Sequence, residues 1–301
     1  MTRVALVLIA IPAVLLLARG GSGDPLLPDP LDPTPGFPQV GEPRFLDAGD
    51  DPDATTVWGR VECTKEERHT LIASGGDGHL RADREPQGND SYRRLRLRDG
   101  DEFYGERCEL GLNDHRTSPV ALYREGDRSI TFISLRLPPG FPLHTRSWQV
   151  LMQIKQSQPA DGGNGSPRLA LQAADGRWIL THAGPSETDV GDGTVWSAPA
   201  RIGVWTRFAF DVVYSADPSV GSVRLSADLN GDGDARDARE QSGVAKLQTL
   251  RRERAGGSDD GLTAGDPIPS HLRAGLYHDP EIRCPRRGCF VDVDNVAVHL
   301  R

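Results

Sequence analysis

The sequence predicts an all-β protein whose folded part is an antiparallel β-sandwich. Several stretches alternate apolar and polar residues with period two, and glycine- and aspartate-rich turns separate them. No long stretch repeats apolar residues at helical spacing. Glycine and proline are abundant, at 34 and 23 residues, whereas aromatic residues make up only 6% of the chain. Such a composition suits many short strands joined by turns better than a helical bundle.

The N-terminus has the pattern of an export signal. Arg3 precedes an unbroken apolar run over residues 4–18, which is short for a membrane span and suits a signal segment. We therefore interpret residues 1–23 as a signal peptide and the protein as secreted. Because no clear cleavage site follows the run, the alternative is an uncleaved anchor that holds an outward-facing protein on the membrane. Membrane contact is expected only in that case.

Residues 24–43 are dense in proline and are expected to form an extended linker, because proline blocks regular structure. The folded domain is expected to span residues 44–301, a length that can bury a sizeable core, and to be a monomer. The net charge of -8 argues against a protein that coats nucleic acid. Three of the 35 basic residues are lysines, so 32 are arginines. This excess reflects either compositional bias or guanidinium groups that bind carboxylates or sulfates.

Four stretches show the alternation of a half-buried strand most clearly, and the last of them shifts phase at Asn295. Each can turn an apolar face to a core and a polar face outward, as in an antiparallel sandwich. The apolar sets are Trp148, Val150, Met152 and Ile154; Phe208, Phe210, Val212 and Tyr214; Leu272, Ala274 and Leu276; and Val291, Val293, Val296, Val298 and Leu300.

Four cysteines suit an exported protein. Cys284 and Cys289 flank a turn-like insert and are predicted to pair, which leaves Cys63 for Cys108. Four cysteines allow three pairings in all. The cysteines show no CxxC spacing and no histidine partner in a metal-binding pattern.

Three short segments place polar side chains on one face of a strand while the alternate positions are apolar or cysteine. If each segment is a strand, these side chains lie together on an open surface where a glutamate can orient a cation. Taken singly, each is an ordinary solvated strand residue. The polar members are Arg107 and Glu109, Gln153 and Lys155, and Arg273 and Tyr277.

Together the three segments resemble the signature strands of the jelly-roll polysaccharide lyases, the group that contains heparinase I, glucuronan lyase and the alginate lyases. The family carries R-x-E-L, Q-x-H and K-x-G-x-Y strands across one concave sheet. Here the segments read Arg107-Cys108-Glu109-Leu110, Gln153-Ile154-Lys155 and Arg273-Ala274-Gly275-Leu276-Tyr277, in the same order. The resemblance implies a jelly-roll, concanavalin A-like sandwich.

The resemblance also implies a reaction, β-elimination on a 4-linked uronate polymer, with an acidic polysaccharide as partner. The enzyme removes the C5 proton beside a carboxylate and then expels the 4-linked oxygen. Arg107 and Gln153 would stabilise the developing enediolate. Tyr277 would protonate the leaving oxygen, or act as base in its phenolate form, which a nearby Arg273 favours.

The identity of the base stays open at this level. The lysine of the family is Arg273 here, which keeps the charge, whereas its frequent histidine, often the base, is Lys155. Lys155 or a histidine, namely His79, His144 or His278, would be the second proton-transfer group, and no sequence rule selects among them. Substrate binding is expected from Arg273, Glu109 and His278.

Two other functions stay open. A protein of the same fold could bind acidic glycans without catalysis. A glycoside hydrolase would need two facing carboxylates; Glu106 and Glu109 point to opposite faces of a regular strand, and Asp292 and Asp294 suit an edge or turn. The sequence does not select the uronate or decide between internal and terminal cuts.

A second motif begins at Asp228 and starts like a calcium loop, with oxygen ligands at positions 1, 3 and 5 and glycine at position 6. Arg239 occupies the position where such loops carry glutamate, and Glu240 follows it. The segment is either a structural Ca²⁺ site or a plain Asn-Gly-Asp-Gly turn. The candidate ligands are Asp228, Asn230, Asp232, Asp234, Asp237 and Glu240.

Overall fold

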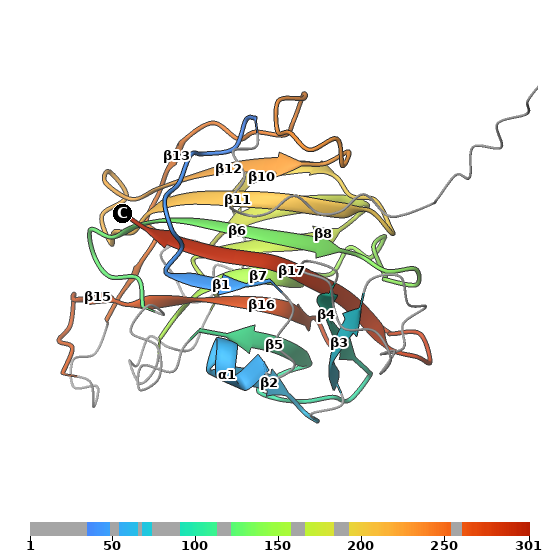
Figure 1. Cartoon of the computed structure of the whole chain (residues 1–301). Helices are drawn as coiled ribbons and strands as arrows, with labels where there is room; N and C mark the ends of the chain where they lie inside the picture. The colour runs from blue at the N-terminus through green and yellow to red at the C-terminus, as the bar shows by residue number, and fades with distance from the viewer. Residues whose placement is uncertain are drawn as a thin grey trace, which may run out of the picture.

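The computed structural model describes residues 35–48, 54–65, 68–73, 91–112, 122–157, 166–183, 193–253 and 261–301. These residues form two large antiparallel sheets that pack face to face, and one short helix, α1 (Ala54–Trp58). Figure 1 shows the sheets as two layers. The predicted antiparallel sandwich of the jelly-roll kind is therefore confirmed.

We call the seven-stranded sheet the front sheet and the eight-stranded sheet the back sheet. In spatial order the front sheet is β10 (Gly193–Pro199), β9 (Arg177–His182), β8 (Leu169–Ala174), β7 (Gln149–Gln156), β16 (Ser270–His278), β5 (Arg107–Gly111) and β2 (Arg60–Cys63). The back sheet is β13 (Ala245–Lys246), β12 (Ser222–Asp228), β11 (Trp205–Val213), β6 (Arg128–Arg136), β17 (Cys289–Leu300), β4 (Ser91–Leu97) and β3 (His69–Ala73), with β1 (Phe45–Asp47) paired to β17. A further small sheet pairs β14 (Arg251–Arg252) with β15 (Pro267–Ile268).

The core lies between the two sheets and is built from the apolar faces that the alternation predicts. Phe208, Phe210 and Val212 of β11 enter it from the back sheet, and Leu272 and Leu276 of β16 enter it from the front sheet. Burial of such side chains drives folding at roughly 25 cal/mol per Å² of apolar surface. The polar positions of the same strands are thereby turned to the two outer faces.

Register shifts interrupt several strand pairs, and two of them bear on the predicted alternation. The pairing of β17 with β6 shifts between Asp294 and Ala297, and Asn295 has φ 48°, which confirms the phase shift predicted there. In β7 the register to β8 shifts between Val150 and Met152. Val150 lies opposite Tyr277 and is buried as predicted, at 5% exposed, but it stands outside the main core cluster.

The described part of the predicted linker is packed on the domain. Phe37 is 7% exposed and lies against Phe132 on the outer face of the back sheet, with ring centroids 6.2 Å apart. Ala235 N donates to Pro35 O at 2.9 Å. An aromatic side chain inside the proline-rich stretch thus covers an apolar patch of the sandwich, and the domain boundary at residue 44 stays a prediction.

Gly275 allows β16 to lie tightly against β5. Its φ is +149°, and a Cβ at this position would lie 2.3 Å from the carbonyl oxygen of Cys108 and 2.7 Å from the Cα of Glu109. Only glycine fits such a close approach of two backbones. The close contact brings Tyr277 of β16 opposite Arg107 of β5.

Both predicted disulfides are present. Cys63–Cys108 joins β2 to β5, and Cys284–Cys289 closes the loop that leads into β17. The predicted signal segment, residues 1–23, lies outside the described residues. Within the described ranges no helix is long and apolar enough to cross a membrane.

Candidate active site

Three neighbouring strands of the front sheet, β5, β16 and β7, bring the candidate residues to one outer face. Arg273 lies opposite Gln153, Tyr277 lies opposite Arg107, and Lys155 lies opposite His271. The grouping predicted from the three segments is therefore found. The catalytic and binding roles of these residues remain predictions.

Tyr277 is held between a cation and an aromatic ring. The guanidinium carbon of Arg107 lies 4.0 Å from the centre of the tyrosine ring, and Trp148 packs edge-on at 4.7 Å between centroids. Arg107 Nη2 also donates to the carbonyl oxygen of Tyr104 at 2.7 Å. Arg107 and Trp148 thus hold the tyrosine ring in place. Because Tyr277 is partly exposed, it can still meet a ligand.

Two buried glutamates hold the guanidinium groups from below. Glu62 and Glu109 are cross-strand partners whose side chains are 2% and 0% exposed. Arg273 Nη1 donates to Glu62 Oε2 at 2.5 Å, and Arg107 Nη1 lies 3.4 Å from an oxygen of each glutamate. Gln153 Nε2 donates to Glu109 Oε1 at 2.5 Å. The polar groups that would meet a substrate are thus oriented before it arrives.

The environment of Glu109 opposes its ionisation only in part. Burial raises the pKa of this carboxyl and Glu62 adds to the rise, whereas Arg273, Arg107 and the hydrogen bond from Gln153 lower the pKa. The side chain of Glu109 is 0% exposed and contacts Arg107, Arg273 and Gln153. Its substrate-binding role stays a prediction.

Lys155 sits in an unusually cationic setting. Burial lowers the pKa of its amine to about 7, and the positive charges of Arg273, Arg251 and Arg107 act in the same direction. Its side chain is partly exposed at the outer face. Near neutral pH this lysine therefore exchanges between ammonium and amine, and the amine is able to accept a proton.

Sequence reasoning missed two residues of this face. His271 Nε2 accepts a hydrogen bond from Arg273 Nε at 2.9 Å. The sequence signal for His271 was its position two residues before Arg273 on one strand, because alternate strand residues face the same side. The signal for Glu62 was the predicted Cys63–Cys108 bond, because antiparallel pairing then sets Glu62 opposite Glu109.

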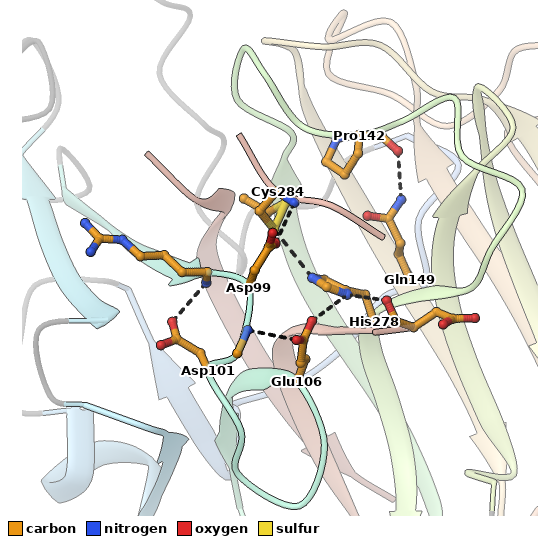
Figure 2. The surroundings of a disulfide bond; sticks show 11 residues. Asp99, Asp101, Glu106, Pro142, Gln149, His278 and Cys284 are labelled. Carbon is orange, nitrogen blue, oxygen red and sulfur yellow. Dashed lines mark hydrogen bonds and ion pairs between the residues drawn. A yellow bond between two sulfur atoms is a disulfide. The ribbon is translucent and has the colours of Figure 1, made fainter. Parts of the chain in front are cut away.

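The other proposed histidines do not join this face. His278 is 0% exposed, and its Nδ1 lies 2.8 Å from the carbonyl oxygen of Asp279. Figure 2 shows the ring between Glu106 and the Cys284–Cys289 bond, with Nε2 3.5 Å from Cys284 Sγ. His278, the next residue along β16, therefore lies apart from the side chains grouped around Tyr277, and its substrate-binding role stays a prediction. His144 is exposed beside Gly176, and His79 lies outside the described residues.

Carboxylates of the calcium-like loop accept hydrogen bonds from the backbone of the same loop. Asp228 accepts hydrogen bonds from the backbone of Gly231 and Gly233, and Glu240 accepts them from Leu229 and Asp237. Burial raises the pKa of both acids. Asn230 Nδ2 donates to Asp232 and Asp237, and Asp234 caps the backbone of Arg236. Calcium binding by this loop stays a prediction.

The fold and the front face define a class of protein, the β-sandwich enzymes that cleave polysaccharides by elimination. A family model described as polysaccharide lyase matches residues 56–290, and the chain belongs to this family. The protein is therefore a polysaccharide lyase. A comparison with curated protein sequences finds no match.

Two solved structures illustrate the likeness of fold. The endo-β-1,4-glucuronan lyase from the fungus Trichoderma reesei is 15% identical with a TM-score of 0.51, covering 80% of this chain and 90% of the other. The marine PL-14 alginate lyase from Aplysia kurodai is 9% identical with a TM-score of 0.54, covering 87% of this chain and 100% of the other. At these identities the likeness concerns the fold.

Proposed function

We propose that the protein is an exported lyase that cleaves a 4-linked uronate polysaccharide by β-elimination, with Lys155 as base and Tyr277 as acid. The observation that carries the proposal is the cationic front face, where a lysine of lowered pKa and a tyrosine flank two glutamate-held arginines. A face of this kind suits a substrate that carries a carboxylate beside the bond to be broken.

Neutralising the substrate carboxylate is the first requirement, because the C5 proton is barely acidic beside a charged carboxylate. Arg107 and Arg273 provide two fixed positive charges, and Gln153 on β7 lies opposite Arg273, on the side away from Arg107. Their glutamate partners hold these donors in place, so little reorganisation is needed when charge develops. The enediolate that forms on the carboxylate is thereby stabilised more than the ground state.

Proton abstraction falls to Lys155. Its unprotonated amine takes the C5 proton and becomes ammonium, and the electron pair of the C–H bond moves into the carboxylate as the enediolate. Burial, with the neighbouring arginines, lowers the pKa of Lys155 to about 7, so a large share of the side chain is amine near neutral pH. This assignment places a lysine where lyases of this kind often carry histidine.

Expulsion of the leaving group falls to Tyr277. As the C4–O bond breaks and the C4–C5 double bond forms, the phenol donates its proton to the departing oxygen. The guanidinium of Arg107 over the ring stabilises the phenolate that remains. Transfer of the proton held by Lys155 to water, and of a proton from water to the phenolate, restores both groups.

Export is supported by the two disulfides, which persist in oxidising compartments. The signal-like N-terminal pattern points the same way. We propose that the mature protein acts outside the cell as a monomer on an acidic polysaccharide.

An ultraviolet assay for unsaturated uronate products tests the proposal. Glucuronan and alginate are the first substrates to try, because the two similar structures are lyases of these polymers by name; heparin and chondroitin complete the panel. Unsaturated product supports the proposal. New reducing ends without unsaturation would mean a hydrolase, and retention of the polymer without turnover would mean a binding protein.

A further inference from the structure

Tyr104 is an aromatic side chain in an unusual place. It is 81% exposed, the largest value among the exposed large hydrophobic side chains of the described residues. Its backbone has φ 54°, in the left-handed region that bulky residues rarely adopt. Turn positions of this kind ordinarily carry glycine, asparagine or aspartate. A tyrosine here is both conformationally costly and open to solvent.

The surrounding chain holds Tyr104 in this conformation. Glu102 and Glu106 form an antiparallel bridge, and Phe103 N donates to Gly105 O at 2.9 Å, so the segment turns back on itself within a few residues. Arg107 Nη2 fixes the carbonyl oxygen of Tyr104 at 2.7 Å. The same arginine stacks on Tyr277, so one guanidinium links this turn to the proposed acid.

The turn also lies directly beside Tyr277. A Cβ built on Gly105 would come within 3.0 Å of Tyr277 Cε2 and 3.4 Å of the phenol oxygen. Gly105 thus leaves the hydroxyl accessible, and the neighbouring Tyr104 stands at the Tyr277 end of the front face. Lys155 lies opposite His271, toward the start of β16.

Packing does not account for the side chain. Tyr104 contacts Phe103 edge-on, with centroids 5.4 Å apart, yet most of its own surface remains in solvent. The side chain of Tyr104 is exposed and its backbone is strained, so this residue contributes little to the stability of the fold. Its backbone is nevertheless held by Arg107 of the candidate site. Such strain persists where surrounding structure enforces it and is concentrated at functional positions.

We propose that the ring of Tyr104 is a stacking platform for a pyranose ring of the polysaccharide, on the leaving-group side of the cleaved bond. The C–H groups on one face of a pyranose form an apolar patch that matches the electron-rich face of an aromatic ring. The location rests on the proposed function, in which Tyr277 protonates the departing oxygen. The sugars beyond that oxygen then pass over the turn that carries Tyr104.

The test compares Tyr104→Asn with Tyr104→Phe on a polyuronate that the wild-type enzyme cleaves. Asparagine tolerates the left-handed backbone, so the first variant removes the ring without disturbing the turn. We expect its KM to rise about tenfold, as for the loss of a small apolar contact. Tyr104→Phe keeps the ring face, and its KM should lie closer to wild type. Val244→Asn, at another exposed position, is the matched control and should leave KM unchanged.

Binding measured in a Tyr277→Phe background gives a second readout, in which Tyr104→Asn should weaken the Kd for the same polymer by a similar factor. A KM for Tyr104→Asn equal to wild type overturns the inference. So does an equal loss in Tyr104→Phe, because the hydroxyl and not the ring face would then be responsible. A wild-type enzyme that makes no unsaturated product from any uronate polymer would instead overturn the proposed function.

Discussion

Replacing Lys155 by arginine should remove the base while keeping a positive charge. With a pKa of about 7 in place of the ordinary 10.5, about half of the lysine is amine at pH 7, against roughly one part in 3,000 for an unperturbed lysine. Arginine stays protonated throughout. We therefore expect kcat of Lys155→Arg to fall by about 10²–10⁴, the usual contribution of a general base.

The pH dependence follows with a definite sign. Because the amine is the active form, kcat/KM of the wild type should rise as pH increases through about 7 and then level off. Lys155→His restores a base with an ordinary pKa of about 6.5, so this limb should move to lower pH. Initial rates of double-bond formation, recorded at constant ionic strength across the neutral range, measure both effects.

Lys246→Arg is the matched control. Lys246 is exposed on β13, the edge strand of the back sheet, and is not part of the front sheet that carries Lys155. A Lys155→Arg variant with wild-type kcat would refute the base role. The role would also be refuted if Lys155→His left the rise of kcat/KM with pH at the same pH as in the wild type. If Lys155 only attracts the polyanion, the defect of Lys155→Ala should shrink as salt rises, because salt screens such attraction.

Three further perturbations test other parts of the molecule. Tyr277→Phe should abolish turnover, by about 10²–10⁴, and spare binding of the polymer, whereas Arg107→Ala should weaken both; near-normal turnover of the phenylalanine variant would remove Tyr277 from the reaction. Gly275→Ala should lower stability by about 1–3 kcal/mol or more, seen as an earlier denaturation midpoint, because the added Cβ meets the backbone of β5; an unchanged midpoint would contradict the close approach. If the loop from Asp228 to Glu240 binds calcium, a chelator should lower Tm, since a ligand bound only to the native state stabilises it; identical melting curves would leave a turn closed by its own hydrogen bonds.

Much of the architecture could be predicted because alternation and turn residues are local signals. The core face of β11 and the phase shift at Asn295 follow from the side-chain period of a strand. The bulge in β7 was missed because nothing in the local pattern shows where a register slips. The docking of Phe37 was missed because its partner, Phe132, is distant in sequence.

The same contrast holds for the front face. The alternation of side chains along each strand placed Arg107, Gln153 and Tyr277 together, and the register shifts in β7 and β16 do not separate them. The buried support of Glu62 depends on a strand pairing across the sheet, which parity alone does not specify. The structure buries His278 apart from this group, as expected for a residue that follows Tyr277 directly, because adjacent strand residues face opposite sides.

The order of strands has a consequence for how the protein reaches its folded state. β16 lies between β5 and β7, and β17 lies between β6 and β4, so the last segments of the chain supply interior strands of both sheets. Until β16 and β17 have been made, each sheet remains divided into halves that cannot pair. Contacts between segments so distant in sequence form slowly. The front face of this topology is therefore assembled only after β16 has inserted between β5 and β7.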